Sequence, residues 1–202
     1  MIPGGAIGSA VSDLFPAWRW VLAALVVLLP AIWVMATYNG LVRLKQYVRE
    51  SWAGIDTELK RRYDLIPNLV ATVKGYAAHE RATLERVIAA RAGAVASTGS
   101  PASQARDENV LIGSLRQLLA VAENYPDLKA NASFLALQKE LANTEDRIQA
   151  ARRFYNANVR DLDTREAVFP SNLIARLFGF QPAEFFEIEE AIRRGPAPQV
   201  NI

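Results

Sequence analysis

Apolar residues are concentrated in one long block near the N-terminus of the chain. No charged side chain occurs between Trp20 and Val42, and the core of this run reads WVLAALVVLLPAIWVMAT. A helix that crosses a bilayer needs about 20 consecutive apolar residues, so the block is long enough to span one. Aromatic side chains of the kind found at membrane interfaces lie near its ends: Trp18, Trp20, Trp33 and Tyr38. The block predicts a transmembrane helix over residues 19–42, preceded by a short extracytoplasmic segment over residues 1–18.

Two other interpretations of this block are a cleaved signal peptide and a buried core helix. A signal peptide begins with a basic segment and has a shorter apolar core before its cleavage site. Here no Lys or Arg precedes Arg19, and the block continues into further helical sequence at LVRLKQYVRESW. Both features favour an uncleaved anchor.

Basic residues flank the predicted anchor unevenly. Arg19 is the one basic residue on its N-terminal side. Six follow within about 20 residues of its other end, namely Arg43, Lys45, Arg49, Lys60, Arg61 and Arg62. Because cytoplasmic flanks carry the excess of Lys and Arg, we expect a single-pass protein of the cell (inner) membrane, with the N-terminus outside and the following domain in the cytoplasm.

The chain after Val42 has the apolar periodicity of helices and lacks the alternating runs that mark strands. Four helices are predicted, over residues 43–63, 64–96, 103–125 and 131–168. Asp64 is the expected N-cap of the second, with Pro67 in its first turn. Short connections favour antiparallel neighbours. The sequence therefore predicts an all-α fold: a four-helix antiparallel bundle over residues 43–168, and then an aromatic-rich C-terminal segment and tail over residues 169–202.

The fourth predicted helix has the most regular pattern in the chain. Apolar or aromatic residues recur every seven positions at Phe134, Leu141, Ile148, Tyr155 and Leu162. A second heptad position holds Leu137, Thr144, Ala151 and Asn158. This spacing predicts a bundle or coiled-coil seam. Gln138, Glu145 and Arg152 share a third phase, and such a polar line either fixes the register between helices or is simply solvated.

Large apolar residues are dense in the C-terminal segment: Leu173, Ile174, Leu177, Phe178, Phe180, Phe185, Phe186 and Ile188. In an antiparallel bundle the fourth helix ends at the same end of the bundle as the anchor. One hypothesis is that part of the segment lies on the membrane surface. The other, which we favour, is that these side chains cover the open end of the bundle.

Composition excludes several classes of chemistry. The 202 residues include no cysteine, so disulfides, thiolate catalysis and cysteine-ligated zinc are absent. The formal net charge of +2 gives no strong field for nucleic acid, and we expect no nucleic-acid partner. The one histidine, His79, is followed by Glu80, but this adjacent pair does not share a helix face and no HExxH pattern occurs. We therefore predict no catalytic, cofactor-binding or metal-binding residue.

The basic cluster of Lys60, Arg61 and Arg62 has two interpretations. It could form an anion site at the start of the second helix, because helix N-termini bind anions. Alternatively, its side chains could pair with carboxylates of the fourth helix such as Glu140, Glu145 or Asp146. We favour the pairing.

Several blocks of the chain resemble the LemA family. The first block contains YNGLV, RRYDLIPNLV and GYAAHE, the second runs from Phe134 to Asp163, and the third is FPSNLIARLFGFQPAEFF. The motif positions are Tyr38, Asn39, Arg61, Arg62, Tyr63, Asp64, Pro67, Asn68, Gly75, Tyr76, His79, Glu80, Glu145, Arg152, Tyr155, Asn156, Phe169 and Pro170. The resemblance covers most of the chain after the anchor.

This resemblance implies a single-span membrane protein with long antiparallel helices and no established enzymatic activity. Relatives in magnetosome-forming bacteria are tied to forming organelle membranes. We expect a membrane-anchored interaction or scaffolding module whose partners are the lipid bilayer and another protein or a second copy, with no small-molecule substrate. The alternatives are a homo-oligomeric protein that organises or remodels membranes and, with the weakest support, a membrane-associated enzyme.

Overall fold

The computed structural model describes the backbone of residues 7–188 and the side chains of residues 18–188. All regular structure in this part of the chain is helical, which confirms the predicted all-α class. The six helices are α1 (Ile7–Tyr76), α2 (Arg81–Ala96), α3 (Pro101–Ala122), α4 (Pro126–Ala130), α5 (Ala132–Ala167) and α6 (Ser171–Leu177).

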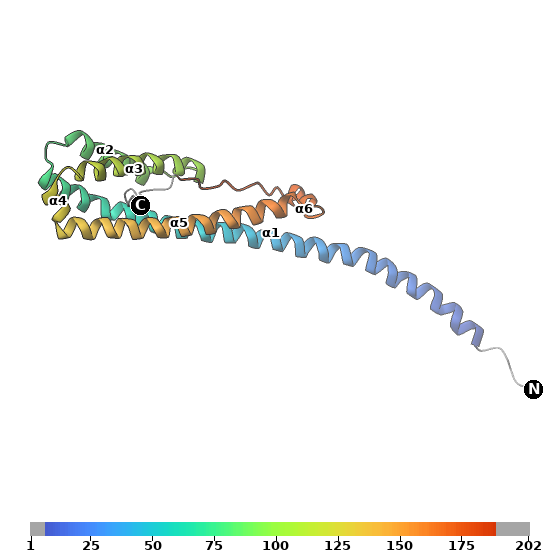
Figure 1. Cartoon of the computed structure of the whole chain (residues 1–202). Helices are drawn as coiled ribbons and strands as arrows, with labels where there is room; N and C mark the ends of the chain where they lie inside the picture. Colours follow the sequence, from blue (N-terminus) through green and yellow to red (C-terminus); the bar gives the residue numbers. More distant parts are fainter. Residues whose placement is uncertain (1–6, 189–202) are drawn as a thin grey trace, which may run out of the picture.

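The N-terminal part of α1 projects well beyond the bundle (Figure 1). By length and composition, α1 is a helix that could cross a membrane. Only 6% of its most apolar window is buried against the rest of the described chain. That exposure argues against a buried core helix, because a core helix would have its apolar face covered.

The sequence prediction was wrong about where the first helix ends. We expected a break at Asp64, but α1 continues through Asp64 and Pro67 to Tyr76. The turn between α1 and α2 lies at residues 77–80, so GYAAHE forms the end of α1 and this turn. Asp64 is therefore a residue of the helix interior and not an N-cap.

A specific contact compensates for Pro67 in the middle of α1. Proline has no N–H, so the carbonyl four residues earlier, that of Tyr63, loses its helical hydrogen bond. Arg91 of α2 donates from Nε to this carbonyl at 2.7 Å. The orphaned acceptor is thus satisfied by a neighbouring helix, and α1 does not end there.

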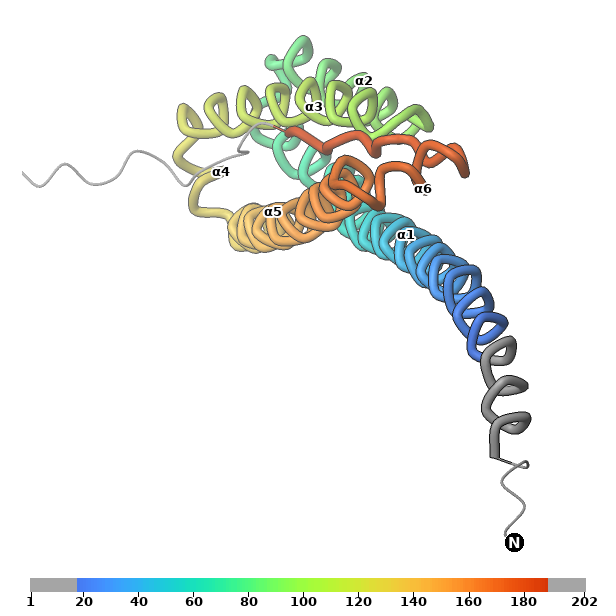
Figure 2. The backbone as a smooth tube through the Cα atoms, turned by 90° about the vertical axis from the view of Figure 1, so that its right-hand side faces the viewer, coloured from blue at the N-terminus to red at the C-terminus, as the bar shows by residue number. Residues whose placement is uncertain are grey.

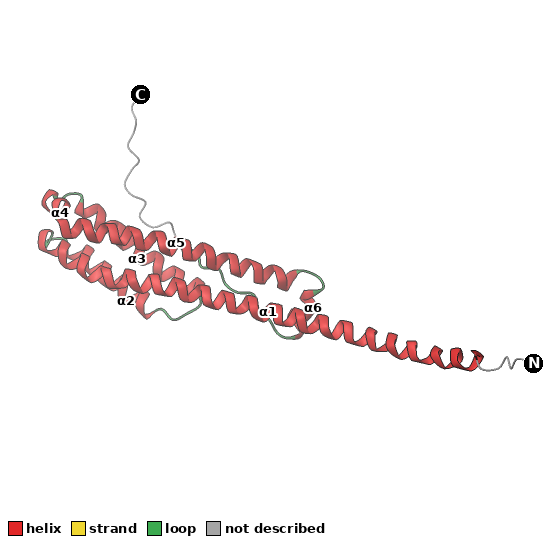
Figure 3. Cartoon of the chain, turned by 90° about the horizontal axis from the view of Figure 1, so that it is seen from below, coloured by secondary structure: helices red, strands yellow, loops and turns green. Residues whose placement is uncertain are grey.

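The four long helices form two antiparallel pairs. α5 packs along α1, and α3 packs along α2 (Figure 3). Two side chains cap helix starts: Ser100 accepts from the Ser103 N–H, and Asn131 accepts from the Phe134 N–H. Pro126 is the first residue of the short α4, a helix that sequence analysis did not predict between residues 125 and 131.

The seven-residue seam predicted for the fourth helix is the buried face of α5. Phe134, Leu141, Ile148, Tyr155 and Leu162 are all buried. They belong to three apolar clusters that follow one another along the bundle axis. The hypothesis that this seam is core is therefore confirmed.

The C-terminal segment turns back after α6 and runs along the bundle without regular secondary structure (Figure 2). Phe186 and Ile188 are buried in the central apolar cluster. Leu173, Leu177 and Phe178 remain exposed at the end of the bundle from which α1 projects. The segment thus covers the bundle with some of its apolar residues and leaves others uncovered.

Candidate functional site

A groove runs between α3 and α5, because each of these helices packs mainly on a different partner. The extended residues 183–188 fill one half of it, because they contact both helices, and they run antiparallel to α5 (Figure 1). Side chains of α5 bind the backbone of this segment. Tyr155 donates to the Glu184 carbonyl at 2.8 Å, Arg152 donates to the Ile188 carbonyl at 2.7 Å, and Asn156 bonds both the N–H and the carbonyl of Phe186.

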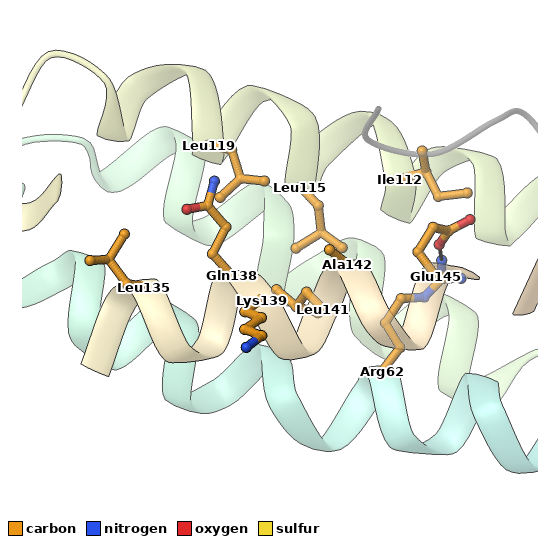
Figure 4. Close-up of a pocket in the computed structure, with 10 residues that line it drawn as sticks. All are labelled: Arg62, Ile112, Leu115, Leu119, Leu135, Gln138, Lys139, Leu141, Ala142 and Glu145. Atoms are coloured by element: carbon orange, nitrogen blue, oxygen red, sulfur yellow. Dashed lines mark hydrogen bonds and ion pairs between the residues drawn. The ribbon is translucent and has the colours of Figure 1, made fainter. Parts of the chain in front are cut away.

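The other half of the groove is an open cavity of about 280 Å³. Its walls come from α3 and α5, with Arg62 of α1 at its inner end (Figure 4). The lining residues are Arg62, Ile112, Leu115, Leu119, Leu135, Gln138, Lys139, Leu141, Ala142 and Glu145. The bound segment reaches Ile188 beside Arg152 of α5. The cavity begins about two helical turns closer to the start of α5, at Glu145. The filled and open halves are therefore continuous.

An ionic cluster joins three helices at the inner end of the cavity. The Arg62 guanidinium donates to Glu108 of α3 and, at 3.0 Å, to Glu145 of α5. The Tyr63 hydroxyl also donates to Glu108, and Gln149 donates to Glu145 at 2.8 Å. The side chains of Arg62, Glu108 and Glu145 are almost fully buried. Burial and the adjacent Glu108 carboxylate raise the pKa of Tyr63 well above its usual value, so its hydroxyl stays a donor.

One nitrogen of the Arg62 guanidinium takes no part in this cluster. Its Nε has no hydrogen-bond partner among the described residues, and the atom is sealed from solvent. A buried donor without a partner is costly, so this N–H lowers what the ionic cluster contributes to stability. The Arg62 residue also lines the cavity.

The contact between Tyr155 and the bound segment predicts a pH dependence. Burial, with the Glu184 and Asp163 carboxylates nearby, raises the pKa of Tyr155 to about 12. A tyrosine in an unfolded chain has a pKa of about 10. The stability that Tyr155 contributes is therefore fully present below pH 10 and is lost as the pH rises from about 10 through about 12.

We expect Tyr155→Phe to lose about 1 kcal/mol at neutral pH, because the hydrogen bond to Glu184 is gone. Between about pH 10 and pH 12 the stability of this variant should fall less steeply than that of the parent. Denaturant unfolding across that pH range measures both effects, with the exposed Tyr47→Phe as the control. Parallel pH profiles for Tyr155→Phe and the parent would contradict the assignment.

The structure brings six of the motif residues to the groove. Arg62, Tyr63 and Glu145 belong to the ionic cluster, and Arg152, Tyr155 and Asn156 bind the C-terminal segment. The polar line of Gln138, Glu145 and Arg152 therefore faces the groove. The predicted pairing of the basic cluster with a carboxylate of the fourth helix is confirmed for Arg62 and Glu145.

The other motif residues lie away from the groove. Arg61, Asp64 and Asn68 are exposed on α1, and no helix starts near Asp64, so the alternative of an anion site at such a start does not apply. Gly75, Tyr76, His79 and Glu80 lie at the far end of the bundle, where Asn131 donates to the Tyr76 hydroxyl and Tyr125 donates to Glu80. His79 is exposed.

Four motif residues mark the opposite end, beside the predicted anchor. The Tyr38 ring contacts Phe178 and Phe180, and Asn39 next to it is exposed. Phe169 and Pro170, joined by a cis peptide bond, precede α6. The described side chains include no group of three or more His, Asp or Glu residues that could hold a metal ion.

Sequence analysis missed Glu108, the third member of the ionic cluster. A signal for it exists in the spacing of α3. Ala105, Glu108, Ile112 and Leu115 lie at helical intervals on one face, so an acidic residue occupies a position of the apolar stripe. A charge in such a position is buried only when it is paired, which points to a basic partner on another helix.

Comparison of the sequence with known proteins gives a family match and several relatives. The family model described as LemA family matches residues 51–201. Magnetosome protein MamQ 2 of Paramagnetospirillum magneticum is 25% identical over 183 residues, which cover 78% of this chain and 67% of that protein. Protein LemA of Metamycoplasma hominis is 25% identical over 156 residues, which cover 77% of this chain and 71% of that protein.

Proposed function

Since this chain belongs to the LemA family, we propose that it is a membrane-anchored, non-enzymatic interaction protein whose open groove binds an extended segment of another polypeptide. The predicted anchor (residues 19–42) holds the bundle at the cell (inner) membrane. The excess of basic residues after the anchor favours a cytoplasmic bundle, with the N-terminus outside.

The observation that carries this proposal is that one half of the groove binds an extended segment of the chain and the other half is open. Over one half, α5 side chains bind the backbone of an extended segment. Over the other half, the same groove continues as an open cavity lined mainly by apolar side chains of α3 and α5. A second extended segment, placed in line with residues 183–188, would complete the pattern.

The chemistry of the cavity defines the expected occupant. Ile112, Leu115 and Leu119 of α3 face Leu135 and Leu141 of α5, so the buried side chains of the ligand should be apolar (Figure 4). Gln138 lines the same cavity and offers an amide that can bond a peptide group of the ligand. An extended peptide with apolar side chains fits both features.

Photo-cross-linking in cells tests this proposal. A photo-reactive amino acid placed at Leu135, or separately at Gln138, should cross-link to one short contiguous stretch of another protein, identified by mass spectrometry. The same group at Phe154, an exposed apolar residue of α5 away from the cavity, is the control and should not trap that stretch.

Two outcomes would overturn the proposal. Cross-links from Leu135 and Gln138 to residues 189–202 of the same chain would mean that the protein covers the cavity with its own tail. Cross-links that are scattered over many proteins, and that match those from Phe154, would mean that the cavity has no specific occupant.

A second candidate function is the organisation of membranes by assembled copies. It is favoured by the similarity to proteins named magnetosome protein MamQ, from Paramagnetospirillum magneticum and Magnetospirillum gryphiswaldense. It requires oligomers on the membrane. Mass photometry of the chain in native nanodiscs should then give regular multiples of one copy, whereas single copies at every expression level would exclude it.

A further inference from the structure

A group of exposed apolar side chains surrounds α6 at the end of the bundle. We name Val168, Phe169, Leu173, Leu177 and Phe178 the membrane foot. Leu177 is 75% exposed and Phe169 is 74% exposed, which is unusual for residues so large. Large exposed apolar side chains gathered at one end of a bundle point to a binding site for a protein or a membrane. The position of the membrane foot relative to the anchor indicates that a membrane, and not a protein, covers these side chains.

Contacts with α1 fix the height of the membrane foot along the anchor. Ile174 and Ala175, on the buried side of α6, pack against Leu41 of α1. The ring of Phe178 lies 4.8 Å from the ring of Tyr38, centre to centre. Both α1 residues belong to the uncharged run Trp20–Val42. The foot therefore overlaps the last turns of the run that is predicted to span the bilayer (Figures 1 and 2).

The length of a spanning helix places this overlap at the bilayer surface. About 20 apolar residues are needed to cross the hydrocarbon core. Counted from Trp20, the first residue of the uncharged run, such a span extends to about Asn39. Tyr38 lies at that boundary, and the ring of Phe178 contacts the ring of Tyr38 at the same level.

The charges around the membrane foot suit the same environment. Arg43, Lys45, Arg165 and Arg176 are exposed on the three helices at this end of the bundle, whereas the acidic Asp163 and Glu166 beside them are partly buried. The ammonium group of Lys45 lies over the ring of Phe180, 5.9 Å from its centre. Apolar side chains that enter the interface, with basic residues level with the headgroups, are the pattern of segments that lie in a bilayer surface.

The geometry points to a second contact between this protein and the bilayer: the membrane foot inserts into the interface beside the anchor and holds the bundle at a fixed angle to the membrane. This contact rests on the proposed anchoring of the chain through residues 19–42. With one span alone the bundle could swivel on α1. With the foot inserted, one side of the bundle is tied to the surface, so the open groove keeps a constant orientation.

The absence of cysteine allows single-site labelling of the full chain. A fluorophore is attached at Leu177→Cys or Phe169→Cys in the membrane foot, at Met35→Cys in the anchor as a positive control, or at Phe154→Cys as a control on the bundle. Each labelled protein is reconstituted in vesicles of phosphatidylethanolamine and phosphatidylglycerol, in equal parts, with or without brominated acyl chains. Circular dichroism verifies that each variant keeps its helical fold.

We expect brominated lipid to quench the labels at Leu177 and Phe169 nearly as strongly as the label at Met35, and to leave the label at Phe154 unchanged. Quenching at Met35, with labels in the foot that behave like the label at Phe154, would overturn this inference and leave the anchoring intact. No quenching at Met35, with protein that fails to float with the vesicles, would overturn the anchoring and the foot together.

Discussion

Replacing Arg62 by methionine is expected to destabilise the bundle by about 3–5 kcal/mol. The substitution keeps an unbranched side chain, although a shorter one, and removes the one guanidinium that binds both Glu108 and Glu145. Two buried carboxylates would then be left without a cation, and a buried charge without a partner is far more costly than a broken surface ion pair. Denaturant unfolding of the full chain in detergent, followed by circular dichroism, measures the loss.

Two further variants separate the loss of pairing from the loss of packing. Arg61→Met is the matched control, because Arg61 is partly exposed and its weak pair with Glu58 is 3.8 Å long. It should cost about 0–1 kcal/mol. The triple variant Arg62→Met, Glu108→Leu and Glu145→Leu should recover most of the stability, since an apolar core often replaces a buried ion cluster without loss. An unfolding free energy for Arg62→Met within the range of Arg61→Met would contradict the account.

Ile148→Asp is expected to prevent stable folding of the bundle. Ile148 lies at the centre of the α5 seam, is fully buried, and has Ile55, Ile112 and Phe186 in the same apolar cluster. A carboxylate there would lose its hydration without gaining a partner, which costs several kcal/mol in addition to the lost apolar contact. A typical domain has only about 5–15 kcal/mol of stability to lose.

Thermal melting followed by circular dichroism measures the effect of Ile148→Asp on the stability of the bundle. The matched control is Phe154→Asp, which places the same charge on the exposed side of α5 and should leave melting nearly unchanged. The helical content of α1 beyond the bundle would survive in Ile148→Asp, so the cooperative transition is the quantity to compare. An unchanged cooperative transition in Ile148→Asp would show that the seam is not the core.

Much of this fold follows from local patterns in the sequence. The α5 seam is a direct consequence of its seven-residue spacing, and the projecting part of α1 is a direct consequence of the uncharged run Trp20–Val42. Both predictions depend on one helix at a time. They succeed because the apolar face of a helix must be buried against something, whatever the partner.

The boundary between α1 and α2 could not be predicted in this way. Asp64 and Pro67 form a good helix start by local rules, yet α1 passes through both residues. The bond from Arg91 to the Tyr63 carbonyl offsets the cost of Pro67, and this bond forms only after α2 has folded back along α1. A local rule for proline fails here because a residue distant in sequence supplies the missing donor.

The candidate site was only partly predictable for the same reason. The pairing of Arg62 with Glu145 followed from placing a basic cluster opposite an acidic helix. Glu108 was detectable as a charge in the apolar stripe of α3. The groove itself depends on the spacing between α3 and α5, and on how residues 183–188 fill part of it, so no single segment contains a signal for it.

Binding of the cross-linked segment to the purified full chain is the measurement that tests the central claim most directly. A synthetic peptide of that segment, titrated into the protein by calorimetry, should bind with one site per chain. In Leu119→Asp, which places a charge in the apolar wall of the cavity, its affinity should fall by roughly tenfold or more. Equal affinity for the parent and Leu119→Asp, or no binding to either, would contradict the assignment of the groove as the binding site.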